Sequence, residues 1–96
     1  MIVDPYGRLH RALAVSAARY GLTLRLLGTT ERPWFSATFA GSRLTVALGI
    51  DGGDPAAWLA TLPEEELSMP GRLVADLAVT GRSADDAMLE VLLLEA

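Results

Sequence analysis

Residues 34–50, WFSATFAGSRLTVALGI, restrict how this chain can fold more than any other segment. Two runs rich in Thr, Val and aromatic residues flank Gly41 and Ser42, a pair that suits a two-residue turn, so the segment predicts a β-hairpin. Successive strand residues point to opposite faces, and this register gathers the apolar residues on one face: Phe35, Ala37, Phe39, Leu44, Val46 and Leu48. A sheet with one apolar face has to bury it against other elements.

The two adjacent aromatic residues at the start of this hairpin are predicted to have different roles. Phe35 faces the core in the predicted register, and its replacement by Ala is expected to open a cavity that costs about 3–5 kcal/mol. Trp34 falls on the other face, directly opposite Gly49. An aromatic side chain laid across a strand glycine shields bare backbone, so Trp34 is predicted to lie outside the core.

Two further segments carry the signals of amphipathic helices. The first spans residues 4–21, with Asp4 as N-cap, Pro5 at the first helical position and Gly21 as the stop. Its apolar residues recur at spacings of three and four: Tyr6, Leu9, Leu13, Ala17 and Tyr20. The second spans residues 54–63, and its apolar side consists of Trp58, Leu59 and Leu62.

Alternating patterns predict two more strands. In residues 22–28, LTLRLLG, Leu22, Leu24 and Leu26 alternate with Thr23, Arg25 and Leu27, and a predicted turn at residues 29–33 follows. Residues 72–80 also alternate, and their predicted inner side consists of Leu73, Ala75, Leu77 and Val79. Val74, Asp76 and Ala78 are then expected on the outer side.

The C-terminal residues 83–95 leave two interpretations open. Ser83 with Asp86 three residues later resembles a capping box and favours a helix. A short run dense in Leu and Val after a polar loop favours instead a strand, with residues 87–94 paired to residues 72–80 as a hairpin. The strand is the preferred interpretation.

Together these patterns predict one α+β domain over residues 1–96. The expected architecture is a single layer of about five antiparallel strands with two helices on one face, in the order α-β-β-β-α-β-β. All eight basic residues are arginine, and Lys, Asn and Gln are absent. Such usage is typical of a GC-rich bacterial genome.

The composition limits the classes of function. Hydrophobic residues make up 51% of the chain, more than a domain of this size buries easily, which predicts a homodimer or an unknown protein partner. The net charge of −4 opposes nonspecific nucleic-acid binding, which needs concentrated positive charge. No apolar run is long enough for a membrane span and no secretory signal is visible, so we expect no membrane association and a cytoplasmic location.

No catalytic constellation is visible, and a non-enzymatic role without cofactor or metal is expected. His10 is the single histidine and there is no cysteine, a set from which zinc sites are rarely built. The segment DGGDP, with Asp51 and Asp54, is better explained as a turn plus helix N-cap than as a cation loop. The arginine stripe Arg8, Arg11 and Arg19 is interpreted as a solvated helix face.

The outer face of the predicted sheet is the remaining candidate for function, because its residues are small, weakly polar and partly apolar. Such a surface usually packs against something. The candidate interface or ligand residues are Arg25, Trp34, Thr38, Arg43, Thr45, Asp76 and Leu92. The first hypothesis is an interaction module that homodimerises through this face. The alternative is a small-molecule-binding or enzymatic domain, with a pocket between helices and sheet whose polar groups are Arg25, Arg43 and Asp76.

Overall fold

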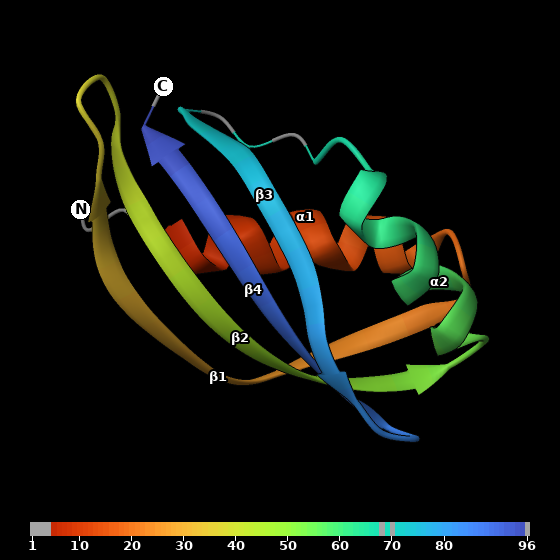
Figure 1. Cartoon of the computed structure of the whole chain (residues 1–96). Coiled ribbons are helices and arrows are strands. Elements are labelled where there is room, and N and C mark those ends of the chain that lie inside the picture. Colours follow the sequence, from red (N-terminus) through yellow and green to blue (C-terminus); the bar gives the residue numbers. More distant parts are fainter. Residues whose placement is uncertain (1–4, 68, 70, 96) are drawn as a thin grey trace.

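A computed structural model describes residues 5–67, 69 and 71–95. Four strands form one antiparallel sheet in the order β1-β2-β4-β3, and α1 lies across one of its faces (Figure 1). The elements follow the chain as α1 (Pro5–Ala18), β1 (Leu22–Phe35), β2 (Ala40–Gly52), α2 (Pro55–Thr61), the short 3-10 helix η1 (Leu62–Glu64), β3 (Arg72–Arg82) and β4 (Asp86–Glu95). None of the described helices has the length and apolar character that crossing a membrane would require.

The α+β class, the single antiparallel sheet and the two helices are confirmed, but the sheet has four strands rather than about five. Residues 29–33, predicted as a turn, lie inside the continuous strand β1. A bulge at Leu27 shifts the pairing register between Leu26 and Gly28 and lets the strand continue. Pro33 is tolerated because β1 is an edge strand, where a missing backbone donor breaks no ladder.

The predicted hairpin register is wrong because the turn lies elsewhere. Residues 36–39 form the loop, where Ser36 N donates to Phe39 O at 2.8 Å and Ser36 Oγ accepts from Phe39 N at 3.0 Å. Gly41 and Ser42 belong to β2 instead. Moving the turn lets β1 and β2 pair along nearly their whole length, from Leu22 opposite Gly52 to Phe35 opposite Ala40.

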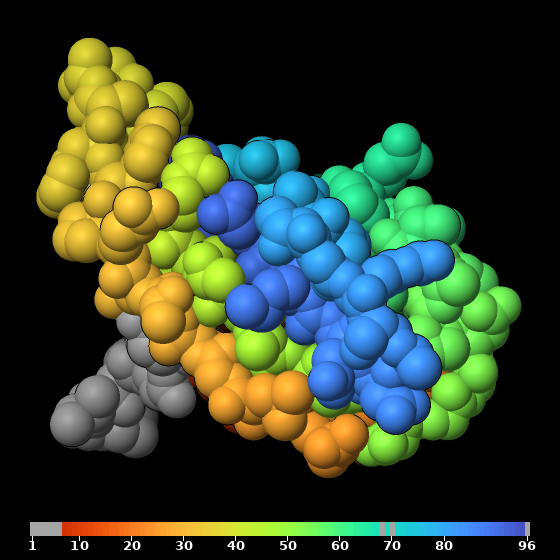
Figure 2. Space-filling model, turned by 60° about the horizontal axis from the view of Figure 1, so that its bottom comes forward, coloured from red at the N-terminus to blue at the C-terminus, as the bar shows by residue number. Residues whose placement is uncertain are grey.

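Phe35 and Phe39 are consequently not core residues, contrary to the prediction. Their side chains are 74% and 53% exposed, respectively. Both lie at the tip of the hairpin, past the last pair that joins β2 to β4. Figure 2 shows this tip, in yellow, standing out from the body of the molecule.

The core lies between the helices and the face of the sheet that they cover. Most inner residues predicted for β2 and for both helices are confirmed as buried: Leu44, Val46, Leu48, Leu9, Leu13, Ala17, Trp58, Leu59 and Leu62. Tyr20, also predicted for the helix face, is only partly buried against this core. The predicted N-cap Asp4 and the side chain of Tyr6 lie outside the described part of the chain. The predicted N-cap Asp54 is confirmed, because its side chain accepts a hydrogen bond from Ala57 N.

The C-terminal strand is confirmed as the partner of β3. Leu89, Val91 and Leu93 are buried, as the alternating pattern predicts. In β3 the predicted alternation is confirmed from Asp76 onward, where Leu77 is buried and Val79 packs against the core. It is wrong before that point, because a bulge at Ala75 shifts the register between Val74 and Asp76. Val74 therefore packs against the core, whereas Leu73 is exposed.

A chain of polar contacts joins the two helices through the core. The indole Nε1 of Trp58 donates to Ser16 Oγ at 2.9 Å, and that hydroxyl in turn donates to Glu65 Oε2. Glu65 also accepts from Arg19 at 2.6 Å. Because Trp58 and Ser16 are both buried, these contacts give every polar atom of the pair a partner inside the protein.

Truncation in the core and truncation at the tip should differ sharply. We expect Leu48→Ala, at a fully buried position, to lower the free energy of unfolding by about 2–5 kcal/mol. Phe35→Ala removes an exposed side chain and should change it by less than about 0.5 kcal/mol. Urea unfolding followed by far-UV circular dichroism measures both, and a large loss for Phe35→Ala would restore it to the core.

Replacing Ser16 tests the polar chain. Ser16→Ala leaves the buried Trp58 indole N–H without its acceptor and Glu65 without one of its donors, and should cost about 1–3 kcal/mol. Thr80→Ala, which loses one exposed contact to Met88 O, is the matched control and should cost clearly less. Equal midpoints in urea for the two variants would contradict a structural role for this chain.

Candidate interaction surface

The face of the sheet opposite α1 and α2, called the open face here, is covered by no other described element. Residue pairing arranges it in rows that run across β1, β2, β4 and β3. We name each row by its β1 residue. In that strand order the rows are Trp34, Gly41, Leu94 and Leu73; Arg32, Arg43, Leu92 and Asp76; Thr30, Thr45, Glu90 and Ala78; Gly28, Ala47, Met88 and Gly81.

Six of the seven candidate residues are brought together on this face by the strand register: Arg25, Trp34, Arg43, Thr45, Asp76 and Leu92. Thr38 is not among them, because it lies in the hairpin loop. Arg32 and Leu73 were missed by the sequence prediction. The predicted turn at residues 29–33 excludes Arg32, although the alternation of Thr30, Arg32 and Trp34 is a signal for a continuous strand. Simple alternation puts Leu73 on the inner side, and the bulge in β3 turns it outward.

Trp34 does lie opposite a strand glycine, but that glycine is Gly41 and not Gly49. The side chain is half-buried. At Gly41 the backbones of β2 and β4 approach so closely that a Cβ atom would lie 2.0 Å from Leu93 O. The next residue of the row, Leu94, is buried although it belongs to the open face. Leu73, at the end of the row, is 56% exposed.

Gly49 has a different neighbour on the open face. The Arg25 guanidinium lies over it, so that a Cβ atom on Gly49 would be 2.7 Å from Arg25 Cζ. Arg25 Nε donates to Asp51 Oδ2 at 2.9 Å. This hydrogen bond, with the charge of the same carboxylate, raises the pKa of Arg25 above its ordinary value. Arg25 is thus held flat against the sheet as a fixed positive charge.

Exposed apolar side chains flank the polar centre of the open face. At the end opposite Trp34, a shallow hollow of about 330 Å³ includes Leu27, Ala47 and Met88 in its lining. Leu27 is the bulge residue of β1, and both Leu27 and Met88 are substantially exposed. The face therefore has an apolar region at each end, one around Trp34 and Leu73 and one around Leu27 and Met88.

Charge divides the open face lengthwise. The β1–β2 half carries Arg25, Arg32 and Arg43, with Asp51 bound to Arg25, whereas the β4–β3 half carries Asp76, Asp86 and Glu90. Arg32 and Arg43 are directly opposite each other, and like charges in such a cross-strand pair repel. No ion pair among the described residues includes Arg32, Arg43 or Asp76.

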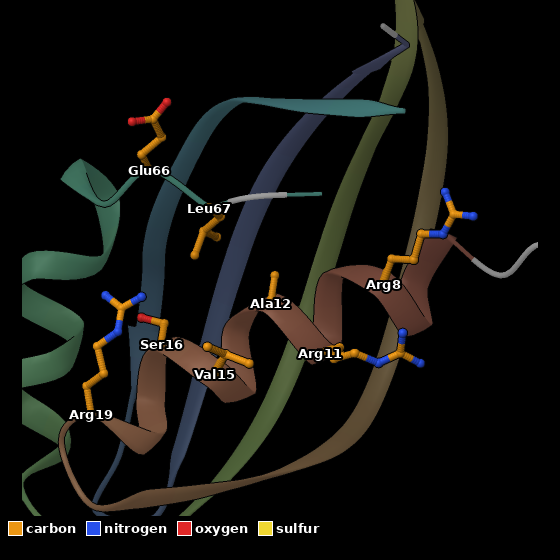
Figure 3. A pocket seen from close by; sticks show the side chains of 8 residues that line it. All are labelled: Arg8, Arg11, Ala12, Val15, Ser16, Arg19, Glu66 and Leu67. Atoms are coloured by element: carbon orange, nitrogen blue, oxygen red, sulfur yellow. The ribbon is translucent and has the colours of Figure 1, made fainter. Parts of the chain in front are cut away.

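A second hollow lies beside α1 and is less suited to binding. It has a volume of about 260 Å³ and is lined by Arg8, Arg11 and Arg19 together with Val15, Glu66 and Leu67 among others. Figure 3 shows Arg8 and Arg11 toward one end of the helix and Arg19 toward the other, with apolar side chains between them. Arg19 is already paired with Glu65. The arginines do not converge, so no anion site is built.

The residues considered for catalysis or metal binding have structural roles or stand alone. Asp54 caps α2 and Asp51 binds Arg25, which uses both carboxylates of the DGGDP segment. His10 is half-buried on α1, and its Nε2 has no hydrogen-bond partner within the described part of the chain. No group of three or more His, Cys, Asp or Glu among the described residues could hold a metal ion.

Comparison with known proteins gives no information on what this surface binds. No protein-family model matches the chain. No curated protein and no solved structure matches it either. No relative therefore supplies an activity or a partner, and the function has to be inferred from the surface itself.

The two glycines of the open face should respond differently to a methyl group. In Gly41→Ala the methyl group meets the Leu93 carbonyl, which cannot yield without parting β2 from β4, and we expect a loss of about 1–3 kcal/mol. In Gly49→Ala it meets only the flexible end of Arg25, whose exposed ion pair contributes little to stability, so the loss should be clearly smaller. Urea unfolding of both variants checks this, and equal losses would contradict the close approach at Gly41.

Proposed function

We propose that this chain is a non-enzymatic protein-interaction module of a bacterial cytoplasm that forms a homodimer through its open face. The observation that carries the proposal is the one-sided arrangement of the helices. Both contribute to a single core on one side of the sheet, and the other side presents Trp34, Leu73, Leu27 and Met88 to its surroundings. Exposed apolar patches on a small domain mark contact surfaces.

The size of the open face is compatible with a dimer. Nine residue pairs join β2 to β4, so the face measures roughly 30 Å along the strands and 19 Å across them. With the relief of its side chains, this approaches the area of about 800 Å² that each partner buries in a standard interface. Two sheets that pack face to face in this way form a sandwich with a shared core.

The β1 edge of the sheet is less suited to association than the face. The edge strand β1 contains a bulge at Leu27, a proline at position 33 and the charged pair Glu31 and Arg32. Bulges, prolines and charges are the features by which natural proteins prevent edge-to-edge pairing. Contact through the face avoids these obstacles.

The alternative of a small-molecule site between helices and sheet has less support. Its three polar residues, Arg25, Arg43 and Asp76, lie on the open face and not beneath the helices. The space under the helices is occupied by the buried side chains of the core. We therefore do not extend the proposal to an enzymatic activity.

Trp34→Ala tests the proposal. If Trp34 is buried in the dimer contact, its loss should weaken association by about 2 kcal/mol or more and leave the fold intact, because the side chain is outside the core. Sedimentation equilibrium or light scattering measures the mass, and far-UV circular dichroism confirms folding. Phe35→Ala is the matched control, since it removes an exposed aromatic from the adjacent position and should keep the wild-type mass. A wild-type protein that is monomeric at micromolar concentration overturns the homodimer.

A further inference from the structure

We infer that the open face is self-complementary, and that two copies pack face to face about a two-fold axis running along the strands between β2 and β4. This inference rests on the proposed homodimer and specifies its geometry. A rotation about such an axis places β1 of one copy over β3 of the second and β2 over β4. Each row of the open face then meets the same row of the second copy in reverse order, as an isologous interface requires.

The Arg32 row supports this inference, because its positive and negative charges lie on opposite sides of the proposed axis. Arg32 and Arg43 occupy its β1 and β2 positions, and Asp76 occupies its β3 position. Reversed order brings Arg32 over Asp76 of the second copy, and Asp76 over Arg32. Each dimer thus contains this ion pair twice, and each copy supplies the carboxylate that relieves the repulsion between the other copy's two arginines.

The distances are suited to such a contact. Arg32 and Asp76 are three strands apart, roughly 14 Å, so each lies about 7 Å from the axis. Sheets in a sandwich are separated by about 10 Å, a gap that an extended arginine and an aspartate side chain can span together. Both residues are exposed in the single chain, which leaves their side chains free to meet a partner.

The other rows are compatible with the same axis. In the Trp34 row, Trp34 comes to lie over Leu73 of the second copy, so a half-buried indole covers an exposed leucine. In the Thr30 row, Thr45 comes to lie over Glu90 of the second copy, and its hydroxyl can donate to that carboxylate. In the Gly28 row the outer positions are Gly28 and Gly81, which allow the two backbones to approach over Ala47 and Met88.

The direction of the axis also decides which ends of the two sheets lie together. Figure 1 shows the tip of the β1–β2 hairpin, the end of β4 and the start of β3 at the same end of the sheet. An axis along the strands keeps that end of one copy next to the same end of the other. An axis perpendicular to the strands would instead place the Trp34 row over the opposite end of the face, near Leu27, and would separate Arg32 from Asp76.

Charge reversal tests the pairing. Arg32→Asp alone and Asp76→Arg alone each place like charges together twice per dimer, and each should weaken self-association by about 100-fold. An equimolar mixture of the two variants should form a heterodimer, because Asp at position 32 of one then faces Arg at position 76 of the other and the remaining pair is native. The double variant Arg32→Asp with Asp76→Arg should again form a homodimer. Native mass spectrometry identifies the species, and sedimentation equilibrium measures their affinities.

Two control reversals make the same charge changes elsewhere. Arg11→Asp alters an exposed residue of α1, on the other side of the sheet, and Glu64→Arg alters an exposed residue of η1. Both should keep the wild-type mass, and far-UV circular dichroism should show all variants folded. A dimeric wild type that neither Arg32→Asp nor Asp76→Arg weakens, or variants that the mixture does not rescue, would overturn this pairing and leave the proposed dimer standing. A monomeric wild type would instead overturn the proposed dimer itself.

Discussion

The burial of Trp58 is the contact on which the arrangement of this small domain depends. Its side chain is 0% exposed, and its indole N–H donates to Ser16 of α1. The helix that carries it, α2, has only seven residues, far fewer than a helix needs to be stable alone. The buried indole, with the N-cap Asp54, therefore holds α2 against α1 and the sheet. Through Ser16 and Glu65 the same contact also fixes the chain that leads from η1 toward β3.

Because both helices pack into this one core, the sheet is covered on one side only. Antiparallel sheets often leave one face in water, and that face is then usually polar. In this chain the open face combines arginines and carboxylates with Trp34, Leu73, Leu27 and Met88. The edge strand β1 is protected by a bulge, a proline and charges, which favours association through the face instead.

The division of charge on that face gives association a direction. A surface with cations on one half and anions on the other attracts a copy of itself only when the halves are reversed, which is the relation that a two-fold axis along the strands imposes. Apolar side chains at both ends of the face then contribute area, whereas the charged rows set the register. The glycines at positions 41 and 49 keep the face flat, since β4 backbone and the Arg25 guanidinium occupy the space next to them.

Local patterns in the sequence determined the two helices, the cap at Asp54 and the pairing of the C-terminal strand with β3. They also determined which β2 residues are buried: Leu44, Val46 and Leu48. Each of these features depends on neighbours within a few residues or on simple alternation.

The hairpin turn was decided by tertiary structure. A two-residue turn at Gly41 and Ser42 is locally favourable, yet it would end the pairing of residues 22–26 with residues 48–52, and the longer ladder prevails. Bulges at Leu27 and Ala75 were equally invisible, because one extra residue reverses which side chains face the core without changing the composition of the strand. The candidate surface was therefore predicted by its strands, but Arg32 and Leu73 joined it, and Thr38 left it, only through the register that the folded sheet adopts.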